Sequence, residues 1–260
     1  MNLVFYLMRS IPLSEETREA WKAYSADNSR VVFIRRKEKK SPAGFMESLA
    51  KLGGREQILL NLGSPTISET LMTAEEIEAG KLWNAQEWIA LTKTPAAMRE
   101  HFTDLIPPLP TTFPCQVWVK PPGQHGIGKY KVKINSLSEL KEGRNQGWDV
   151  QLHIEGNEFR VITVGTTVVQ AFTRHGDNEN RHYTWLGVTG CPKAVKKIAR
   201  EAASKLHKNT VLAWDILLEL GTNKPYLLEG NSCPGVNTET AARILNEITK
   251  QYQERNTCST

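Results

Sequence analysis

Residues 211–231 read VLAWDILLELGTNKPYLLEGN, which is two apolar runs joined by a turn-forming Gly-Thr-Asn-Lys segment. Asp215 interrupts the apolar residues 213–218 of the first run, and Glu229 follows the apolar residues 226–228 of the second. If the hairpin pivots near Thr222, the two carboxylates are equidistant from the pivot and lie opposite each other, with Cβ atoms about 5 Å apart. Asn231 follows Glu229 by two residues and therefore shares its face of the strand.

A carboxylate inside an apolar strand needs compensation, because burying an unpaired charge is costly. Two like charges directly opposite each other also repel, which a cation or a shared proton would relieve. With the amide oxygen of Asn231, Asp215 and Glu229 form an all-oxygen ligand set, which suits magnesium far better than zinc. The pattern therefore predicts a magnesium site on this hairpin. The alternative is another register, in which one carboxylate is a surface group.

A glycine-rich segment at residues 123–130, GQHGIGKY, approaches the P-loop pattern, but Tyr130 stands where that pattern has Ser or Thr. The apolar residues that follow alternate with lysines, which is the period of a strand and not of the helix that a P-loop opens. We therefore expect the loop to join antiparallel strands at 116–120 and 130–134. Its amides are suited to cover phosphates, and Lys120, at the end of the first strand, is placed to neutralise one. The alternatives are an ordinary hairpin tip and a lysine that snorkels to solvent.

The first part of the chain alternates strand and helix signals, which indicate a small parallel α/β unit. Strands are expected at 3–7, 31–34 and 58–62, and helices at 14–24 and 45–52. Short helices at 84–91 and from Thr94, with Pro95 at its first position, precede a proline-rich connector at 107–110.

Beyond the connector the period changes to that of strands. Further strands at 149–154, 158–164 and 167–174 predict, with the two strands around the glycine loop, an antiparallel meander. Residues 175–190 are polar and expected to be irregular, and helices are expected at 192–207 and 238–252. We expect a domain of residues 1–83 and a second of 84–260, divided into 84–150 and 151–260.

Several of these segments together resemble the ATP-grasp superfamily, in particular the branch of D-alanine–D-alanine ligase, glutathione synthetase and peptide-tailing glutamate ligases. The matching segments are VWVKP at 117–121 with its glycine loop, QLHIEGNEFRV at 151–161, WDI at 214–216 and YLLEGNSCPG at 226–235. The resemblance covers about residues 84–246. It implies an α/β (α+β) fold, in which a small parallel N-terminal domain precedes two antiparallel-sheet subdomains that clamp ATP. Gly230 stands where an apolar residue is usual, so a looser strand end is expected there.

The resemblance also implies roles for individual residues. Lys93 and Lys120 would contact the α and β phosphates, and a loop with Gly123, Gly126 and Gly128 would close over the triphosphate. The backbone of a hinge would bind adenine, and Glu158 would bind the ribose. The hinge residues are Gln151, Leu152, His153 and Ile154. The implied magnesium ligands, for two ions, are Asp215, Glu229 and Asn231. With Lys120, Arg160 and Arg174 would stabilise the transferring phosphoryl group or an acyl-phosphate.

The implied activity is an ATP-dependent, ADP-forming carboxylate–amine ligase that forms an amide bond through an acyl-phosphate. Its substrates would be small-molecule or peptide carboxylates and amines. An ATP-grasp kinase would use the same nucleotide site. A basic nucleic-acid-associated module is a third reading, motivated by the RRKEKK run at 35–40 and by a basic helix face of Lys193, Lys196, Lys197 and Arg200. Within the ligase reading, the run would attract an acidic partner such as a tRNA or an acidic peptide.

The composition sets outer limits. Of 260 residues, 40% are hydrophobic and 23% charged, which supports a core and excludes wholesale disorder. A net charge of +5 suits anionic ligands without indicating a polybasic protein. No apolar stretch reaches the roughly 18 residues of a membrane helix, so no membrane contact is expected. The four cysteines form no metal-binding pair, which favours free thiols and a cytoplasmic protein. Whether the chain forms a homodimer is left open.

Overall fold

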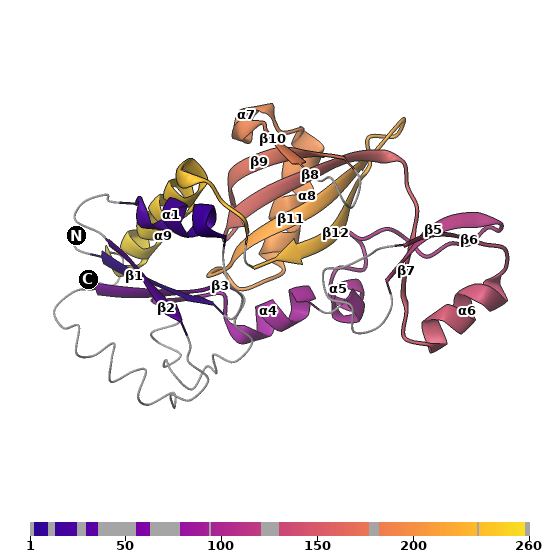
Figure 1. Ribbon diagram of the computed structural model, residues 1–260, viewed down its shortest axis with the longest axis horizontal. Coiled ribbons are helices and arrows are strands. Elements are labelled where there is room, and N and C mark those ends of the chain that lie inside the picture. The colour runs from indigo at the N-terminus through magenta and orange to yellow at the C-terminus, as the bar shows by residue number, and fades with distance from the viewer. Residues whose placement is uncertain are drawn as a thin grey trace.

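The computed structural model describes residues 3–9, 14–24, 30–35, 56–62, 79–93, 95–120, 130–176, 182–232 and 234–257. Three sheets follow one another along the long axis of the molecule (Figure 1). The N-terminal sheet lies at one end, a five-stranded sheet in the middle and a three-stranded sheet at the other end. This order places the two antiparallel sheets next to each other.

The N-terminal sheet confirms the expected parallel unit. Its strands are β1 (Leu3–Arg9), β2 (Arg30–Arg35), β3 (Glu56–Leu62) and β4 (Leu82–Trp83), in the order β2-β1-β3-β4, and the paired strands are parallel. Helix α1 (Glu15–Lys22) begins where expected, because the Ser14 hydroxyl accepts a hydrogen bond from the Thr17 N–H. The helix expected at 45–52 lies outside the described residues.

The five-stranded sheet is antiparallel and has the order β10-β9-β8-β11-β12. Its strands are β8 (Gly156–Val164), β9 (Thr167–His175), β10 (His182–Trp185), β11 (Val211–Glu219) and β12 (Pro225–Asn231). Strand β10 and helix α7 (Gly187–Gly190) occupy the segment that was expected to be irregular, so that expectation was wrong. The strand was missed because none of the four residues of β10 is buried, so the segment lacks the apolar run that indicates a buried strand.

The three-stranded sheet has the order β6-β5-β7, with strands β5 (Cys115–Lys120), β6 (Tyr130–Ile134) and β7 (Asp149–Leu152). Strands β5 and β6 pair antiparallel around the glycine loop, as expected. The continuous meander is wrong, however, because β7 pairs with β5 and not with β8. Strand β7 also extends across residue 150, the expected division between the two subdomains.

Five helices complete the described part of the second domain: α4 (Gln86–Lys93), α5 (Pro95–His101), α6 (Leu137–Asn145), α8 (Lys193–Ser204) and α9 (Thr238–Thr257). Helices α8 and α9 lie where their apolar periodicity predicted them. Helix α4 begins two residues later than expected, since Asn84 has a φ of 59° and its side chain is buried. Helix α6 was not anticipated, although the Ser136 hydroxyl caps its start by accepting from the Glu139 N–H, and the Glu139 carboxylate accepts from the Asn135 N–H.

The two faces of the five-stranded sheet are covered differently. One face packs against α8 through a core that includes Val161, Trp214 and Ile216. The opposite face, at the end that holds Ile162 and Ala213, shares a core with α9 and the N-terminal sheet. Next to this core, the second face carries a row of charged side chains that includes Arg160 and Asp215, and the candidate site lies there.

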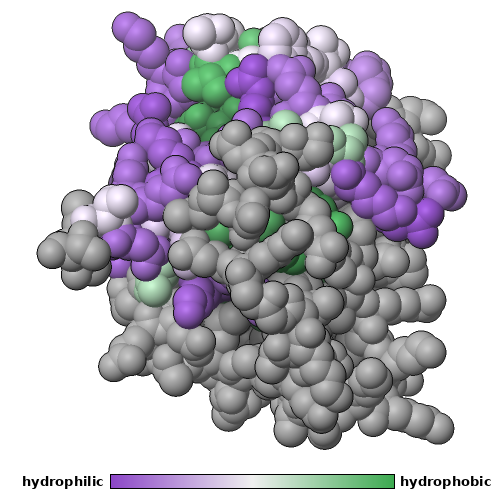
Figure 2. Space-filling model, turned by 90° about the vertical axis from the view of Figure 1, so that its left-hand side faces the viewer, coloured by the Kyte–Doolittle hydropathy of each residue, from purple (hydrophilic) through white to green (hydrophobic). Residues whose placement is uncertain are grey.

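The surface at the N-terminal end is mixed in character. In Figure 2, which faces that end, the described residues in view are mostly hydrophilic with small hydrophobic patches between them. Among the described helices, none is long and apolar enough to cross a membrane.

Candidate active site

Three charged side chains stand in one row across the second face of the five-stranded sheet. The strand register places Arg160 on β8 opposite Asp215 on β11, and Asp215 opposite Glu229 on β12. The neighbouring pair on the same face, Ile162 and Ala213, belongs to the covered core. The charged row therefore begins where the cover by α9 and the N-terminal sheet ends.

A β-bulge brings the two carboxylates face to face. Near the turn the hairpin pairs Leu218 with Pro225, a register that would place Asp215 opposite Leu228. The register shifts beyond Ile216, so that Asp215 pairs with Glu229 instead. Because a shift of one residue turns a side chain to the other face of a strand, the bulge decides that Glu229 lies on the site face. The expected pairing is confirmed, although the register next to the turn would not have produced it without the bulge.

Arg160 and Asp215 form a buried, bidentate ion pair. Arg160 donates from Nε to Oδ1 and from Nη2 to Oδ2 of Asp215, both at 2.7 Å, and Asp215 is only 2% exposed. Burial raises the pKa of Asp215, the hydrogen bonds and charge of Arg160 oppose that rise, and the neighbouring Glu229 adds to it. Burial alone would lower the pKa of Arg160, but Asp215 raises it overall, so the guanidinium stays charged. We infer that the pair is ionised at neutral pH, because a guanidinium only donates.

Tyr183 packs on the same guanidinium, and sequence reasoning missed it. The central carbon of the Arg160 guanidinium lies 4.6 Å from the centroid of the Tyr183 ring, and that ring meets Phe172 edge-on. Asp215 thus holds Arg160 in the plane of the guanidinium, and Tyr183 holds it from one face. Tyr183 lies in the segment that was expected to be irregular, so nothing in the sequence placed it beside Arg160.

A second cross-strand ion pair lies beside the row. Glu158 on β8 is directly opposite Arg174 on β9, and Arg174 donates from Nη1 to Oε2 of Glu158. The expected ribose acid and the expected second arginine are therefore partners of each other. Their individual roles toward a nucleotide stay predictions.

Lys120 connects the two antiparallel sheets. Its Nζ lies 3.9 Å from Oε2 of Glu229, and its side chain is 16% exposed. Alternation along β5 places Val117 and Val119 in the core of the three-stranded sheet, so Lys120 and Trp118 point to the other face. That face is turned toward the charged row. Asn231, which pairs with Ala213, is half-buried on the face that carries Glu229.

The segment 153–155 joins the two sheets and is anchored to both of them. At one end the N–H of His153 donates to the carbonyl of Gln116 on β5, at 3.0 Å. At the other end the carbonyl of Glu155 accepts from the N–H of Leu220, which follows β11, at 2.9 Å. Ile154 lies between the two anchors. The hinge role expected for residues 151–154 stays a prediction.

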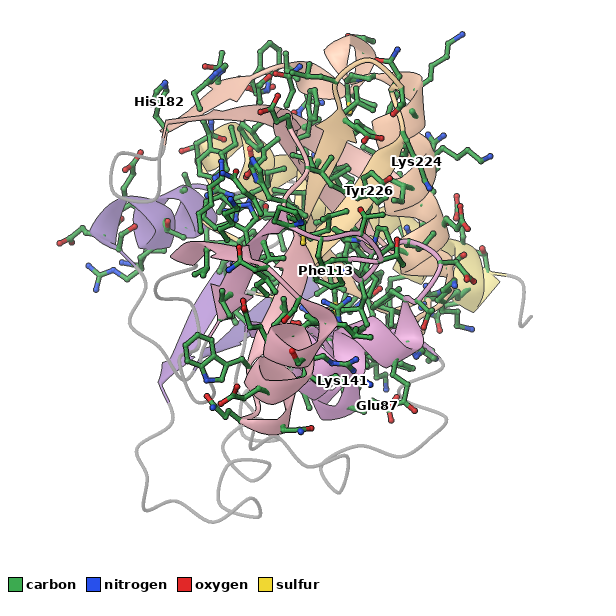
Figure 3. The ribbon with its side chains drawn as sticks, turned by 90° about the vertical axis from the view of Figure 1, so that its right-hand side faces the viewer. Glu87, Phe113, Lys141, His182, Lys224 and Tyr226 are labelled. Atoms are coloured by element: carbon green, nitrogen blue, oxygen red, sulfur yellow. The ribbon has the colours of Figure 1, made fainter. Side chains whose placement is uncertain are left out.

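Figure 3 views the molecule from the end that carries the three-stranded sheet. His182, on β10, and Tyr226, on β12, mark the two edges of the five-stranded sheet behind it. At the tip of the hairpin, Lys224 lies against the ring of Tyr226, at 5.1 Å from its centroid. Phe113 lies near the centre of this view, just before β5 begins.

Some expected site residues cannot be placed. Gly123, Gly126 and Gly128 lie outside the described residues, and only the backbone of Lys93, the last residue of α4, is described. Over the described ranges, no three His, Cys, Asp or Glu side chains lie together so that they could hold a metal ion. The expected magnesium set contains two carboxylates and an amide, so it does not depend on such a cluster.

Gly230 corrects one expectation. A strand end loosened by glycine was expected, but Gly230 is buried and closely surrounded. A Cβ at this position would lie 3.0 Å from both Cγ2 of Thr92 and the indole of Trp214. The absence of a side chain therefore lets α4 approach β12, and the strand end is tightly packed.

Neither protein-family models nor curated proteins match this chain, whereas solved structures do. D-alanine–D-alanine ligase from Bacillus anthracis aligns with a TM-score of 0.64 and 14% identity, over 98% of this chain and 99% of that one. The ATP-grasp ligase PsnB, complexed with minimal precursor, Mg and ADP, aligns with a TM-score of 0.58 and 14% identity, over 95% and 97%. A RimK domain ATP-grasp protein from Sphaerobacter thermophilus aligns with a TM-score of 0.54 and 16% identity, over 94% and 99%. The chain has the fold of the ATP-grasp superfamily.

Proposed function

We propose that this protein is an ATP-dependent, ADP-forming carboxylate–amine ligase that forms an amide bond through an acyl-phosphate. The observation that carries the proposal is the meeting of Arg160, Asp215, Glu229 and Lys120 between the two antiparallel sheets. Similar structures have been solved with ATP, and with Mg and ADP. Cationic and anionic groups facing one another across two sheets suit a magnesium–triphosphate ligand, which carries both kinds of charge.

The donor set fits magnesium. Asp215 and Glu229 lie opposite each other, and Asn231 adds an amide oxygen on the same face. Arg160 takes one lone pair from each oxygen of Asp215, and each oxygen keeps another for a metal. Asp215, Glu229 and Asn231 would therefore hold the metal, which would neutralise phosphate charge. Two ions remain the expected number.

The hinge fits a purine base. Strand β7 is an edge strand of its sheet, and half of its backbone groups face away from β5. Because the N–H of His153 bonds to Gln116, the N–H and carbonyl of Leu152 fall on the open side. Within the described ranges, the backbone of Ile154 makes no hydrogen bond. The carbonyl of Leu152 and the N–H of Ile154 therefore complement adenine: the carbonyl can accept from the amino group, and the N–H can donate to the adjacent ring nitrogen.

The chemistry then follows from the charged groups. A substrate carboxylate oxygen attacks the γ-phosphorus, the bond to the β-phosphate oxygen breaks, and ADP leaves. Lys120 and Lys93 would hold the phosphates, and the N–H groups of Arg160 that do not face Asp215 would stabilise the transferring phosphoryl group. An amine next attacks the acyl carbon, loses a proton and expels phosphate. We propose small-molecule or peptide carboxylates and amines as substrates, and an acidic tRNA or peptide as a partner for the basic run.

The test is a screen of amino acids, dipeptides and carboxylic acids for ATP-dependent mass gain with release of ADP. Glu229→Gln should lower the rate of an active pair about a hundredfold, because it removes a charge that acts on the transition state. Glu201→Gln, at an exposed position on α8, is the matched control and should keep the rate. Full activity of Glu229→Gln would contradict the metal assignment. A phosphorylated product without amide formation would point to the kinase.

A further inference from the structure

Three side chains form a relay from α5 to the hinge. Gln151 and Asp149 are two residues apart on β7, and they share the face of the three-stranded sheet that carries Lys120. The amide nitrogen of Gln151 donates to Oδ2 of Asp149 at 3.3 Å. Oδ1 of Asp149 accepts from Nη2 of Arg99 at 3.0 Å. Arg99 is itself held, since it also donates to the backbone carbonyls of Val150 and Pro107.

The chemistry of these groups fixes which way the Gln151 amide faces. A guanidinium can only donate, and an ionised carboxylate can only accept. Asp149 is paired with Arg99 and lies opposite Lys120 in the strand register, so it is held as an acceptor. The nitrogen of the Gln151 amide must therefore face Asp149. Its oxygen, an acceptor, is left on the other side.

The geometry points to the Arg99–Asp149 pair as the determinant of base preference at the nucleotide site. The pair holds the Gln151 nitrogen against Asp149, so the Gln151 oxygen faces away from Asp149 and is the atom presented to the base. This oxygen accepts a hydrogen bond from a 6-amino group. It cannot bond to a 6-oxo group, which is also an acceptor. Arg99 and Asp149 are positioning residues, and Gln151 is the group that meets the base. This inference rests on the proposed function, which places a purine beside β7 and the hinge.

Asp149→Asn is the decisive substitution because it keeps the shape and changes the donor pattern. Arg99 still only donates, so it would draw the oxygen of the introduced amide toward itself and leave the nitrogen of that amide facing Gln151. The Gln151 amide would then turn over and present its nitrogen to the base. The structure therefore predicts that the preference shifts toward the 6-oxo purine.

The experiment measures the dissociation constants of ADP and IDP, with magnesium, by calorimetry. Wild type should prefer ADP, and Asp149→Asn should move the ratio toward IDP by about tenfold, roughly the value of one hydrogen bond. Asp104→Asn, at an exposed position, is the matched control and should leave the ratio unchanged. In a Gln151→Leu background the amide is gone, so Asp149→Asn should no longer alter the ratio.

The possible outcomes distinguish a failure of the Arg99–Asp149–Gln151 relay from a failure of the proposed nucleotide site. An unchanged ratio in a folded Asp149→Asn variant, or an equal shift in the Gln151→Leu background, would overturn the relay while the nucleotide site stands. If the wild-type chain binds neither nucleotide, the proposed function is wrong and this inference is overturned with it. Thermal unfolding of each variant shows whether the fold is intact.

Discussion

Arg160 and Asp215 are directly opposite each other on β8 and β11 and are joined by two hydrogen bonds of 2.7 Å. The pair lies where the covered core of the five-stranded sheet gives way to the site. At this position the fold buries the Asp215 carboxylate, whereas the site needs the carboxylate to stay charged. Arg160 makes both possible, because it compensates the buried charge and leaves lone pairs of Asp215 available.

Asp215→Asn should destabilise the fold markedly. Replacing the carboxylate by a neutral amide leaves Arg160 as a largely buried charge without its full partner, and breaking a buried pair in this way costs about 3 kcal/mol or more. The free energy of unfolding, measured with urea at pH 7, checks this. Exchanging both Arg160 and Asp215 for Leu should cost less than Asp215→Asn alone, since no charge is then buried. A loss below about 1 kcal/mol for Asp215→Asn would contradict the buried pair.

His153 should make the fold sensitive to mild acid. Burial, together with the charge of Lys131, lowers the pKa of His153 in the folded state, and Glu155 opposes this only partly. As the pH falls through about 6.5, the unfolded chain takes up a proton before the folded chain does, so stability is lost. The loss continues until the pH passes the lowered pKa. Above about pH 7 this contribution is complete.

His153→Gln should flatten the stability curve below about pH 6.5, because the titrating group is removed. The measurement is the unfolding midpoint in urea at several pH values. His182→Gln, at an exposed position on β10, serves as the control for removing a histidine. An equal slope in His153→Gln and wild type would refute the role of His153.

The hairpin shows how far local pattern reaches. The apolar runs and the turn predicted that Asp215 would face Glu229, because strands joined by a short turn pair with each other. The partner of Asp215 on its other side, Arg160, is 55 residues away, and no local pattern identifies which strand will pair there. The wrong meander has the same cause, since β7 has a suitable alternation but finds its partner in β5. The Ser136 N-cap of α6, in contrast, is a local signal that the sequence carries in full and that was missed.

The two described free cysteines should differ in reactivity. Burial raises the pKa of Cys191 to about 11, so about one thiol in a thousand is ionised at pH 8. Burial also raises the pKa of Cys115, but this residue on β5 is only half-buried. Cys115 should therefore be alkylated first in the native protein. Pulsed labelling at pH 8 followed by peptide mass spectrometry tests the order, and faster labelling of Cys191 would contradict it.

Gly230→Ala should destabilise the junction of α4 with the hairpin. The added methyl group would lie 3.0 Å from both Cγ2 of Thr92 and the indole of Trp214. Trp214 cannot give way easily, because it is fully buried and its Nε1 donates to Thr163. Overpacking of this kind costs roughly 1 to 3 kcal/mol.

Gly235→Ala is the matched control, since a Cβ there meets nothing within 4 Å. Urea unfolding of both variants gives the comparison, and equal stability would show that α4 can move away. Because Glu229 adjoins Gly230, such a shift would also alter the affinity for magnesium–ADP, which calorimetry measures separately.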